Sequence, residues 1–199
     1  MKKKRIIIAT HNFFKFSEIS KMLSPLGYEC ISLRDLGYNN DIIEDKDTFE
    51  DNALIKAKTI YDYYKSSVIS DDSGLIVDVL INLPGVHSHR FAKEDANDKE
   101  NRDYLISILK KYGSGPFKAH FETSIIYMDS DKVIKAKGRL DGEIILEERG
   151  NNGFGYDPIF YLKDKSKTLA ELTQDEKNEL SHRHMAIMNL IEELQKWKY

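Results

Sequence analysis

The sequence has very little that could cross-link it or anchor it in a membrane. Cys30 is the only cysteine among 199 residues, so no disulfide can form within the chain, and a reducing compartment, the cytoplasm, is expected. No apolar run approaches the ~18 residues of a membrane span. The apolar run after the basic start, Ile6 to Ala9, is too short for a secretory signal. We therefore expect a cytoplasmic protein with no membrane partner.

An excess of positive charge is also lacking. The 30 Lys and Arg residues face 33 Asp and Glu residues, which leaves a formal net charge of −3. Nonspecific binding to nucleic acid depends on a basic patch or stripe, so no nucleic-acid partner is expected. The chain also contains only four prolines and shows no repeat, low-complexity tract or Pro/Ser-rich linker. We therefore predict a single domain over residues 1–199.

Hydrophobic spacing predicts an α/β fold. The stretch 5–10 reads as a buried strand, 13–26 as an amphipathic helix and 28–33 as a second strand, an order typical of two parallel strands with a crossover. Farther along we predict a helix over 48–64 capped by Asp47 or Thr48, and strand-like segments on either side of Asp71 and Asp72. A third helix is predicted from about Asp95, with these residues facing inward: Leu105, Ile108, Leu109 and Tyr112. An antiparallel hairpin over 119–140 follows, and then a final helix with one apolar stripe: Ile187, Leu190, Ile191 and Leu194.

Two polar stretches lie next to predicted helix starts. "ATHNFFK" joins the first strand to the first helix, where free backbone N–H groups and Lys15 could bind an anion, although simple capping by Thr10 or Asn12 is an equally good interpretation. No Gly-Lys pair exists, so a Walker-type phosphate loop is excluded. In "EDKDTFEDNALIKAK" acidic residues precede the helix, and complementation of the helix dipole is the favoured interpretation of that stretch alone. Lys56 and Lys58 are expected on the solvated surface.

The stretch "SDDSGL" is harder to explain as structure alone. Asp71 and Asp72 follow a strand-like apolar run, and a buried carboxylate is costly unless a partner or a metal meets it. Because side chains alternate along a strand, we expect one aspartate to be a metal ligand and the other to cap or support a turn. The second, Asp72, is the expected ligand.

Two later stretches combine loop residues with polar groups. In "RGNNGFGYDPIF" glycines alternate with Phe154 and Tyr156, which would let a ring stack on a flat ligand while the backbone approaches it closely; a tight structural loop is the alternative. In "EKNELSHRHMA" we expect Lys177, His182 and Arg183 at the head of the last helix, where an Arg fork suits phosphate or a purine edge. The alternative there is a polar helix start.

Taken in order, these motifs resemble the Ham1-type purine nucleoside triphosphate pyrophosphatases, the inosine triphosphatase family. The likeness spans nearly the whole chain through "ATHNFFK", "TFEDNALIKA", "DDSGL", "LPG", "GFGYDPIF", "AEL…EKN" and "SHR". The resemblance implies Mg²⁺-dependent hydrolysis of nonstandard purine triphosphates (ITP, dITP, XTP) to a monophosphate and pyrophosphate. It also implies a homodimer and an α/β fold with a long mixed β-sheet flanked by helices, whose two lobes enclose one cleft.

The resemblance also implies roles for individual residues. Asp72 would be the general base and, with Glu44, a metal ligand, although the sequence leaves open whether Glu44 or Asp45 is the second carboxylate. The implied substrate-binding residues are Thr10, His11, Asn12, Lys15, Ser73, Phe154, Gly155, Tyr156, Asp157, Lys177, His182 and Arg183.

Two other functions are considered beside this one. A Maf-like pyrophosphatase of modified nucleotides is disfavoured by the intact "GFGYDP" and "SHR" motifs. A nucleotide-binding sensor without turnover would be expected to have lost a metal carboxylate, yet Asp71 and Asp72 are both present.

Overall fold

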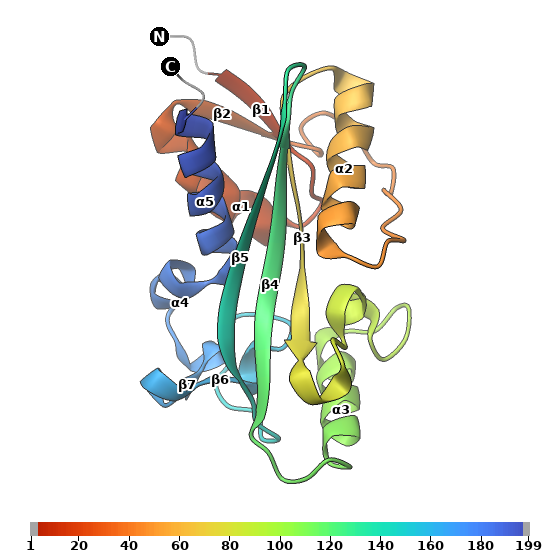
Figure 1. The fold of residues 1–199 in the computed structure, drawn as a ribbon, viewed down its shortest axis with the longest axis vertical. Coiled ribbons are helices and arrows are strands. Elements are labelled where there is room, and N and C mark those ends of the chain that lie inside the picture. Colours follow the sequence, from red (N-terminus) through yellow and green to blue (C-terminus); the bar gives the residue numbers. More distant parts are fainter. Residues whose placement is uncertain (1–3, 197–199) are drawn as a thin grey trace. The chain divides into compact units, whose positions relative to one another are not determined.

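The computed structural model describes residues 4–196, which form an open seven-stranded sheet with flanking helices (Figure 1). The strands are β1 (Lys4–Ile8), β2 (Tyr28–Ser32), β3 (Val68–Val77), β4 (Phe117–Met128), β5 (Val133–Ile144), β6 (Phe160–Leu162) and β7 (Lys167–Thr168). The α-helices are α1 (Phe13–Leu23), α2 (Phe49–Tyr64), α3 (Asp98–Leu109), α4 (Gln174–Leu180) and α5 (His182–Lys196).

The sheet is mixed, as predicted. Its strand order is β2-β1-β3-β4-β5-β6-β7. β1 runs parallel to β2 and to β3, whereas β6 runs antiparallel to β5 and to β7. β4 and β5 are neighbours joined by a tight turn in which the Asp129 N–H donates to the Lys132 carbonyl at 3.0 Å, so the predicted hairpin is confirmed.

The chain divides into two compact units whose boundaries fall within β3, β4 and β5. Unit 1 comprises residues 1–72, 123–138 and 183–199, and unit 2 comprises residues 73–122 and 139–182. A single domain over residues 1–199 and a cleft between two lobes stay predictions.

In unit 1, consecutive residues of β1 point to opposite faces of the sheet. Ile6 and Ile8 belong to the core cluster that contains the buried stripes of α1 and α5, whereas Ile7 packs with α2. This alternation is what a strand covered on both faces requires, and Figure 1 shows α1 and α5 together and α2 apart from them. The predicted stripe of the last helix is confirmed by the burial of these residues: Ile187, Leu190, Ile191 and Leu194.

Helix α2 begins where the sequence allowed two candidate caps. The Thr48 hydroxyl accepts a hydrogen bond from the Asp51 N–H at 3.1 Å, so Thr48, and not Asp47, is the N-cap. The spacing of α2 also predicts one face with Ala53, Ala57, Ile60 and Tyr64; the first three are buried, and Tyr64 is partly exposed.

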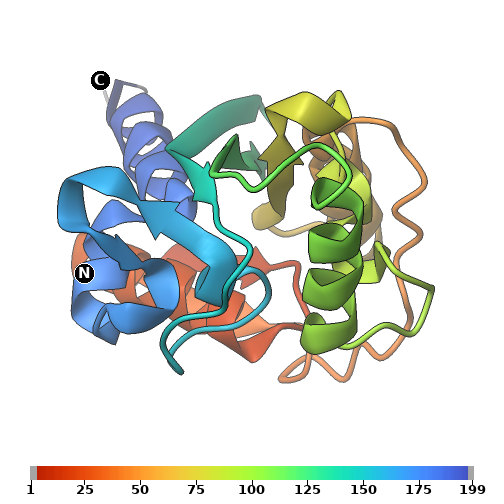
Figure 2. The same cartoon turned by 90° about the horizontal axis from the view of Figure 1, so that it is seen from below.

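A core cluster in unit 2 is built around Leu75 and Val77 of β3, Phe160 of β6 and the buried residues of α3. Figure 2 shows the ribbon of α3 from below. α3 begins at Asp98 and not near Asp95, because Asn97 caps it in a reciprocal capping box with Glu100. Leu105 and Leu109 are buried as predicted. The expectation for Tyr112 was wrong: the helix ends at Leu109, and Tyr112 is exposed.

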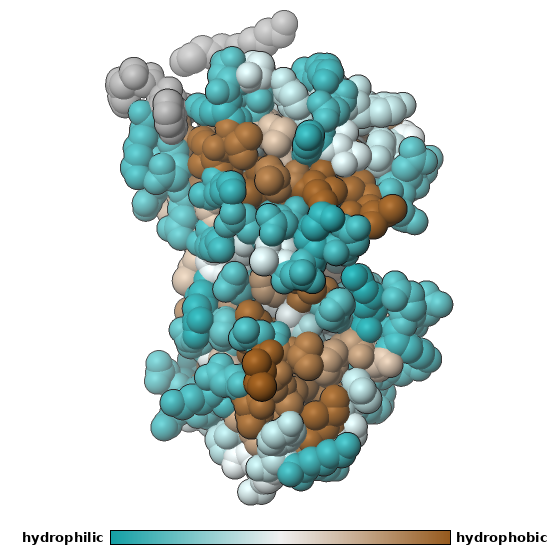
Figure 3. Space-filling view, turned by 45° about the vertical axis from the view of Figure 1, so that its right-hand side comes forward, coloured by the Kyte–Doolittle hydropathy of each residue, from teal (hydrophilic) through white to brown (hydrophobic). Residues whose placement is uncertain are grey.

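Some apolar side chains reach the surface. One face of the molecule shows them gathered in patches among hydrophilic residues (Figure 3). Large exposed apolar residues include Phe13, Phe14 and Ile43 in unit 1, and Ile81 and Leu83 in unit 2. Within residues 4–196, no helix has the length and apolar character that crossing a bilayer requires.

Candidate active site

The loop between β1 and α1, which was expected to bind phosphate, is organised by its own side chains. Asn12 is the N-cap of α1, and its Oδ1 accepts hydrogen bonds from the N–H groups of Phe14 (2.9 Å) and Lys15 (3.1 Å). The Thr10 hydroxyl accepts from the Asn12 N–H at 3.1 Å. Several N–H groups that could have met an anion are therefore capped, and the Lys15 ammonium is the main positive charge of this loop.

His11 links this loop to the acidic segment that precedes α2. Its Nε2 lies 3.2 Å from the Asn40 carbonyl, and its ring stacks against Tyr38 with a centroid separation of 6.4 Å. His11 is exposed, so this contact leaves the ring accessible while tying the two loops of unit 1 together.

The two aspartates do not lie at a strand end. β3 runs without interruption from Val68 to Val77 and carries both of them near its middle, so the expectation that Asp71 caps or supports a turn was wrong. The expected alternation is present: Asp71 is bonded to Lys15 and Arg183, whereas Asp72 accepts from the Asn52 amide at 3.1 Å. Asp71 therefore belongs to a buried ion cluster, whereas Asp72 is bonded to a side chain of α2.

Asp71 is the anion of a buried ion cluster in unit 1. It is 1% exposed, and its Oδ2 lies 2.9 Å from Lys15 Nζ and 3.4 Å from Arg183 Nε. The other end of the Arg183 guanidinium pairs with Glu18. Burial alone would raise the pKa of Asp71, but Lys15 and then Arg183 hold it well below the usual range for a carboxyl. Asp71 is therefore a permanently charged anchor for the Lys15 ammonium.

Asp72 has the opposite electrostatic character. Burial raises its pKa to about 6, and although Lys56 and Lys15 oppose this shift, the nearby Glu44 carboxylate reinforces it. A carboxyl whose pKa lies close to neutrality can exchange a proton near physiological pH, which an ordinary aspartate with a pKa of about 3.9 does poorly. The position suits a general base.

Glu44, and not Asp45, is the second acidic residue near Asp72. Glu44 forms an ion pair with Lys56 of α2 at 2.8 Å, and Lys56 is only 7% exposed. Burial would lower the pKa of Lys56, but the surrounding carboxylates, Asp71 foremost, raise it. Asp45 is exposed and pairs with Lys46.

The donor set of Asp72 and Glu44 fits Mg²⁺. Among the described residues, no group of three or more His, Cys, Asp or Glu side chains is arranged to hold a metal. Mg²⁺ needs no such cage, because it commonly takes one or two carboxylates and fills the remaining positions with water and substrate phosphates. Asp72 and Glu44 supply two carboxylates of this kind, whose contacts are with Asn52 and Lys56.

In unit 2, the loop between β5 and β6 places Phe154 beside Asp157 and Lys177. Phe154 is 39% exposed, its N–H donates to Asp157 Oδ2 at 2.9 Å, and Lys177 Nζ lies 4.6 Å from its ring centroid. Lys177 also forms a buried ion pair with Asp157. Lys177 was expected at the head of the last helix, but it belongs to the separate short helix α4.

The glycines of this loop serve different purposes. A Cβ on Gly150 would lie 2.3 Å from the Ala170 backbone, and one on Gly153 would lie 2.1 Å from Asp157 Oδ2, so these two allow the loop to pack on the protein itself. Gly155 adopts φ +61°, and a Cβ on it would meet no atom within 4 Å. Tyr156 is buried, and its hydroxyl donates to the Ser88 carbonyl at 2.8 Å.

Three further residues that were expected in the site lie at positions in the sequence where the chain passes from one unit to the other. Ser73 is the first residue of unit 2 on β3, and His182 is the last, at the start of α5, where its ring stacks on Phe121 at 4.9 Å between centroids. Arg183 begins the next segment of unit 1 and is buried in the ion cluster with Asp71. The structure thus brings Lys15, Asp71 and Arg183 together in unit 1, and Phe154, Asp157 and Lys177 together in unit 2.

Sequence reasoning missed Lys56 and Asn52, although a signal was present. Both lie at helical spacing on the same stripe of α2 as Ala53 and Ala57, and a polar side chain on a buried stripe needs a polar partner. It also missed Glu18, which pairs with Arg183 from α1; the partner is 165 positions away, and no local pattern indicates it.

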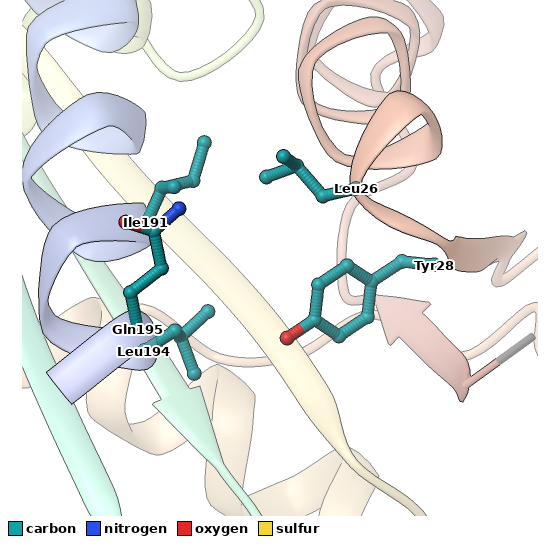
Figure 4. A pocket seen from close by; sticks show the side chains of 5 residues that line it. All are labelled: Leu26, Tyr28, Ile191, Leu194 and Gln195. Carbon is teal, nitrogen blue, oxygen red and sulfur yellow. The ribbon is translucent and has the colours of Figure 1, made fainter. Parts of the chain in front are cut away.

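A small apolar hollow in unit 1 is unrelated to these residues. It is lined by Leu26, Tyr28, Ile191, Leu194 and Gln195, as Figure 4 shows. Its volume is about 10 Å³, room for about one water molecule, so it cannot hold a nucleotide.

Comparison with known proteins gives a consistent answer over nearly the whole chain. The family model described as the Ham1 family matches residues 6–193. A Thermoanaerobacter protein (strain X514) named dITP/XTP pyrophosphatase is 45% identical over 94% of both chains. The Bacillus subtilis protein of the same name is 43% identical over 94% of this chain and 95% of its own.

Two solved structures share the fold. The Ham1 protein of Staphylococcus aureus superposes with a TM-score of 0.89 at 35% identity, covering 98% of this chain and 100% of its own. A HAM1 protein from Coxiella burnetii gives a TM-score of 0.90 at 35% identity, covering 97% and 99%.

The raised pKa of Asp72 predicts a pH-dependent stability effect in metal-free protein. Below about pH 4 the carboxyl is protonated in both folded and unfolded chains; as the pH rises through 6, the folded protein must bear a desolvated charge. Asp72→Asn should therefore raise the free energy of unfolding at pH 8 by on the order of 1–3 kcal/mol and change it little at pH 4. Urea unfolding in EDTA measures both values.

The exposed Asp45 supplies the matched control, because Asp45→Asn removes a neighbouring acidic charge without relieving burial. It should give no comparable rise at pH 8. Equal effects of the two substitutions, or the same gain for Asp72→Asn at both pH values, would contradict the assignment of a desolvated carboxyl to Asp72.

Proposed function

Since this chain belongs to the Ham1 family, we propose that it is a nucleoside triphosphate pyrophosphatase that hydrolyses the nonstandard purine nucleotides ITP, dITP and XTP. The products are the nucleoside monophosphate and pyrophosphate, and the reaction cleanses the nucleotide pool of the cytoplasm. The observation that carries the proposal is the pair of consecutive aspartates on β3, one held charged by Lys15 and Arg183 and the other with a pKa of about 6. The names of relatives 43–45% identical to this chain support it.

The chemical step is assigned to Asp72. It accepts a proton from the water that attacks the α-phosphorus; a new P–O bond forms, and the bond between that phosphorus and the bridging oxygen breaks to release pyrophosphate. The carboxylate of Asp72 is ionised at pH 7 and can therefore accept this proton. Asn52 orients the carboxylate through its 3.1 Å hydrogen bond.

The phosphates are assigned to the cations of unit 1. Lys15 is held by Asp71, and Lys56 by Glu44, so both ammonium groups are fixed before substrate arrives. Preorganised charges need little rearrangement as negative charge builds on the leaving group. Thr10, His11 and Asn12 shape the loop that carries Lys15.

Asp72 and Glu44 would hold Mg²⁺. When bound, the ion supplies neutralisation of the triphosphate and stabilisation of the developing charge on pyrophosphate. The carboxylates of this cluster outnumber its cations, since Lys15, Lys56 and Arg183 face these residues: Glu18, Glu44, Asp71 and Asp72. Without a cation, such a site would repel a polyanionic substrate.

Base recognition is assigned to unit 2. The partly exposed Phe154 ring offers a face for stacking. Hypoxanthine presents an acceptor at the position where adenine presents a donor, so donors at Lys177 or His182 would favour ITP over ATP by about 1–3 kcal/mol for each good pair. Ser73, Gly155, Tyr156 and Asp157 complete the proposed substrate contacts of unit 2, and Arg183 is the proposed contact from unit 1. Excluding GTP requires a penalty on its 2-amino group.

A homodimer is part of the proposal. The apolar side chains of Ile81 and Leu83 are exposed in unit 2, and contact with a second copy of the chain would remove them from water. Light scattering on the purified protein measures the mass directly; a monomer of 23.1 kDa at micromolar concentration would contradict this part.

The proposal predicts a specific pattern of pyrophosphate release. With Mg²⁺, ITP, dITP and XTP should be cleaved at least about tenfold faster than ATP and GTP, and EDTA should abolish all release. Pyrophosphate, not orthophosphate, should be the product. The measurement is the rate of pyrophosphate release from each of these nucleotides, with Mg²⁺ and with EDTA. Binding without any release would favour the nucleotide sensor, and undiminished cleavage under chelation would rule out the metal-dependent scheme.

Asp72→Asn should separate binding from turnover. The amide cannot accept the proton, so the rate should fall by about 10²–10⁴, while dITP affinity measured calorimetrically with Mg²⁺ stays within about tenfold of wild type. Asp45→Asn serves again as the charge-matched control and should keep the wild-type rate. A wild-type rate in Asp72→Asn would remove Asp72 from the role of base.

A further inference from the structure

One turn of α3 in unit 2 holds the loop that carries Phe154. The Asp98 carboxylate accepts a hydrogen bond from the Gly155 N–H at 2.7 Å, and Arg102 Nη1 donates to the Gly155 carbonyl at 2.8 Å. Residues four positions apart lie next to each other on a helix surface. Asp98 and Arg102 therefore bond to the N–H and the carbonyl of the same residue, Gly155. Figure 2 shows the loop that contains it reaching toward α3.

Arg102 also ties down the beginning of the same loop. Its guanidinium forms a fork with Glu148, with Nε–Oε1 at 2.9 Å and Nη2–Oε2 at 3.3 Å, and the side chain is only 12% exposed. One planar group thus bridges Glu148 and Gly155, the two ends of the segment that contains Phe154. A lysine, with a single charged point, could not bond to both ends in this way.

These hydrogen bonds matter because the side chains of the segment are not buried, although the backbone packs closely at Gly150 and Gly153. Residues 147–154 are all exposed, and Gly155 has open space around its α-carbon. Other bonds fix the loop at Arg149 and Asn152. The backbone of Phe154 and Gly155 is therefore held by four hydrogen bonds. Asp98 and Arg102 bond to the N–H and the carbonyl of Gly155, while the Asp157 carboxylate accepts from the Phe154 N–H and the Asp157 N–H donates to the Phe154 carbonyl at 3.2 Å.

We propose that Arg102 and Asp98 are positioning residues for purine recognition, which fix the Phe154 ring through the Gly155 backbone without touching the substrate. This inference rests on the proposed function, because it concerns the base that Phe154 would stack on. Ordering the loop before substrate arrives removes an entropic cost from binding. Losing the hydrogen bonds of Asp98 and Arg102 therefore weakens binding of the base rather than the chemical step.

The first test is Arg102→Ala. The KM for dITP should rise about tenfold, since ordering one or two loop residues costs about that much in affinity, while kcat changes less than about threefold. Arg102→Lys should not restore KM, because the fork is lost. Lys99→Ala, on the same helix but exposed and paired only with Asp103, is the matched control and should behave as wild type.

A second pair of variants separates positioning from charge and from folding. Asp98→Asn keeps an oxygen that can accept from the Gly155 N–H, whereas Asp98→Ala does not; both remove the charge. The KM for dITP should rise in Asp98→Ala and stay near wild type in Asp98→Asn. Amide hydrogen exchange of residues 149–157 should accelerate in Arg102→Ala and Asp98→Ala only.

The inference is overturned if KM and loop exchange are unchanged in Arg102→Ala, or if both Asp98 variants behave alike. A lower melting temperature with unchanged KM would assign the two residues a purely structural role and would also overturn it. Failure of the proposed function looks different: wild-type protein itself would release no pyrophosphate from any nucleotide, while the exchange measurements would still report on these hydrogen bonds.

Discussion

The alternation of side chains along β3 is the constraint on which the proposed chemistry depends. Because neighbouring residues of a strand point to opposite faces, Asp71 and Asp72 meet different partners although they are adjacent in sequence. Asp71 is bonded to Lys15 and Arg183, and Asp72 is desolvated beside Glu44. The same residue type therefore supplies a permanent charge on one face and a titratable group on the other.

The two units rely on different physical devices. Unit 1 holds its functional groups with buried ion pairs, which are costly to desolvate and demand good geometry, so its cations and carboxylates have little freedom. Unit 2 holds an exposed loop by hydrogen bonds from α3 to the backbone of Gly155.

What could be predicted from the sequence was what local periodicity determines. The strand–helix–strand start and the buried stripe of α5 are confirmed because apolar spacing alone specifies them. The continuity of β3 was missed because Asp-Asp-Ser-Gly resembles a turn. Within the strand, Lys15 and Arg183 pair with one oxygen of Asp71, and Asn52 donates to Asp72. Lys15, Arg183 and Asn52 are distant in sequence from the aspartates that they contact, as Arg102 is from Gly155.

The most direct test of the central claim is to titrate the two carboxyl groups individually, by carbon NMR of labelled aspartates in metal-free protein. The account predicts that Asp72 titrates near pH 6, that Asp71 stays ionised well below the usual carboxyl range, and that Mg²⁺ lowers the pKa of Asp72 only. If both groups titrate together near pH 4, or if Mg²⁺ shifts neither, the division of roles along β3 is contradicted.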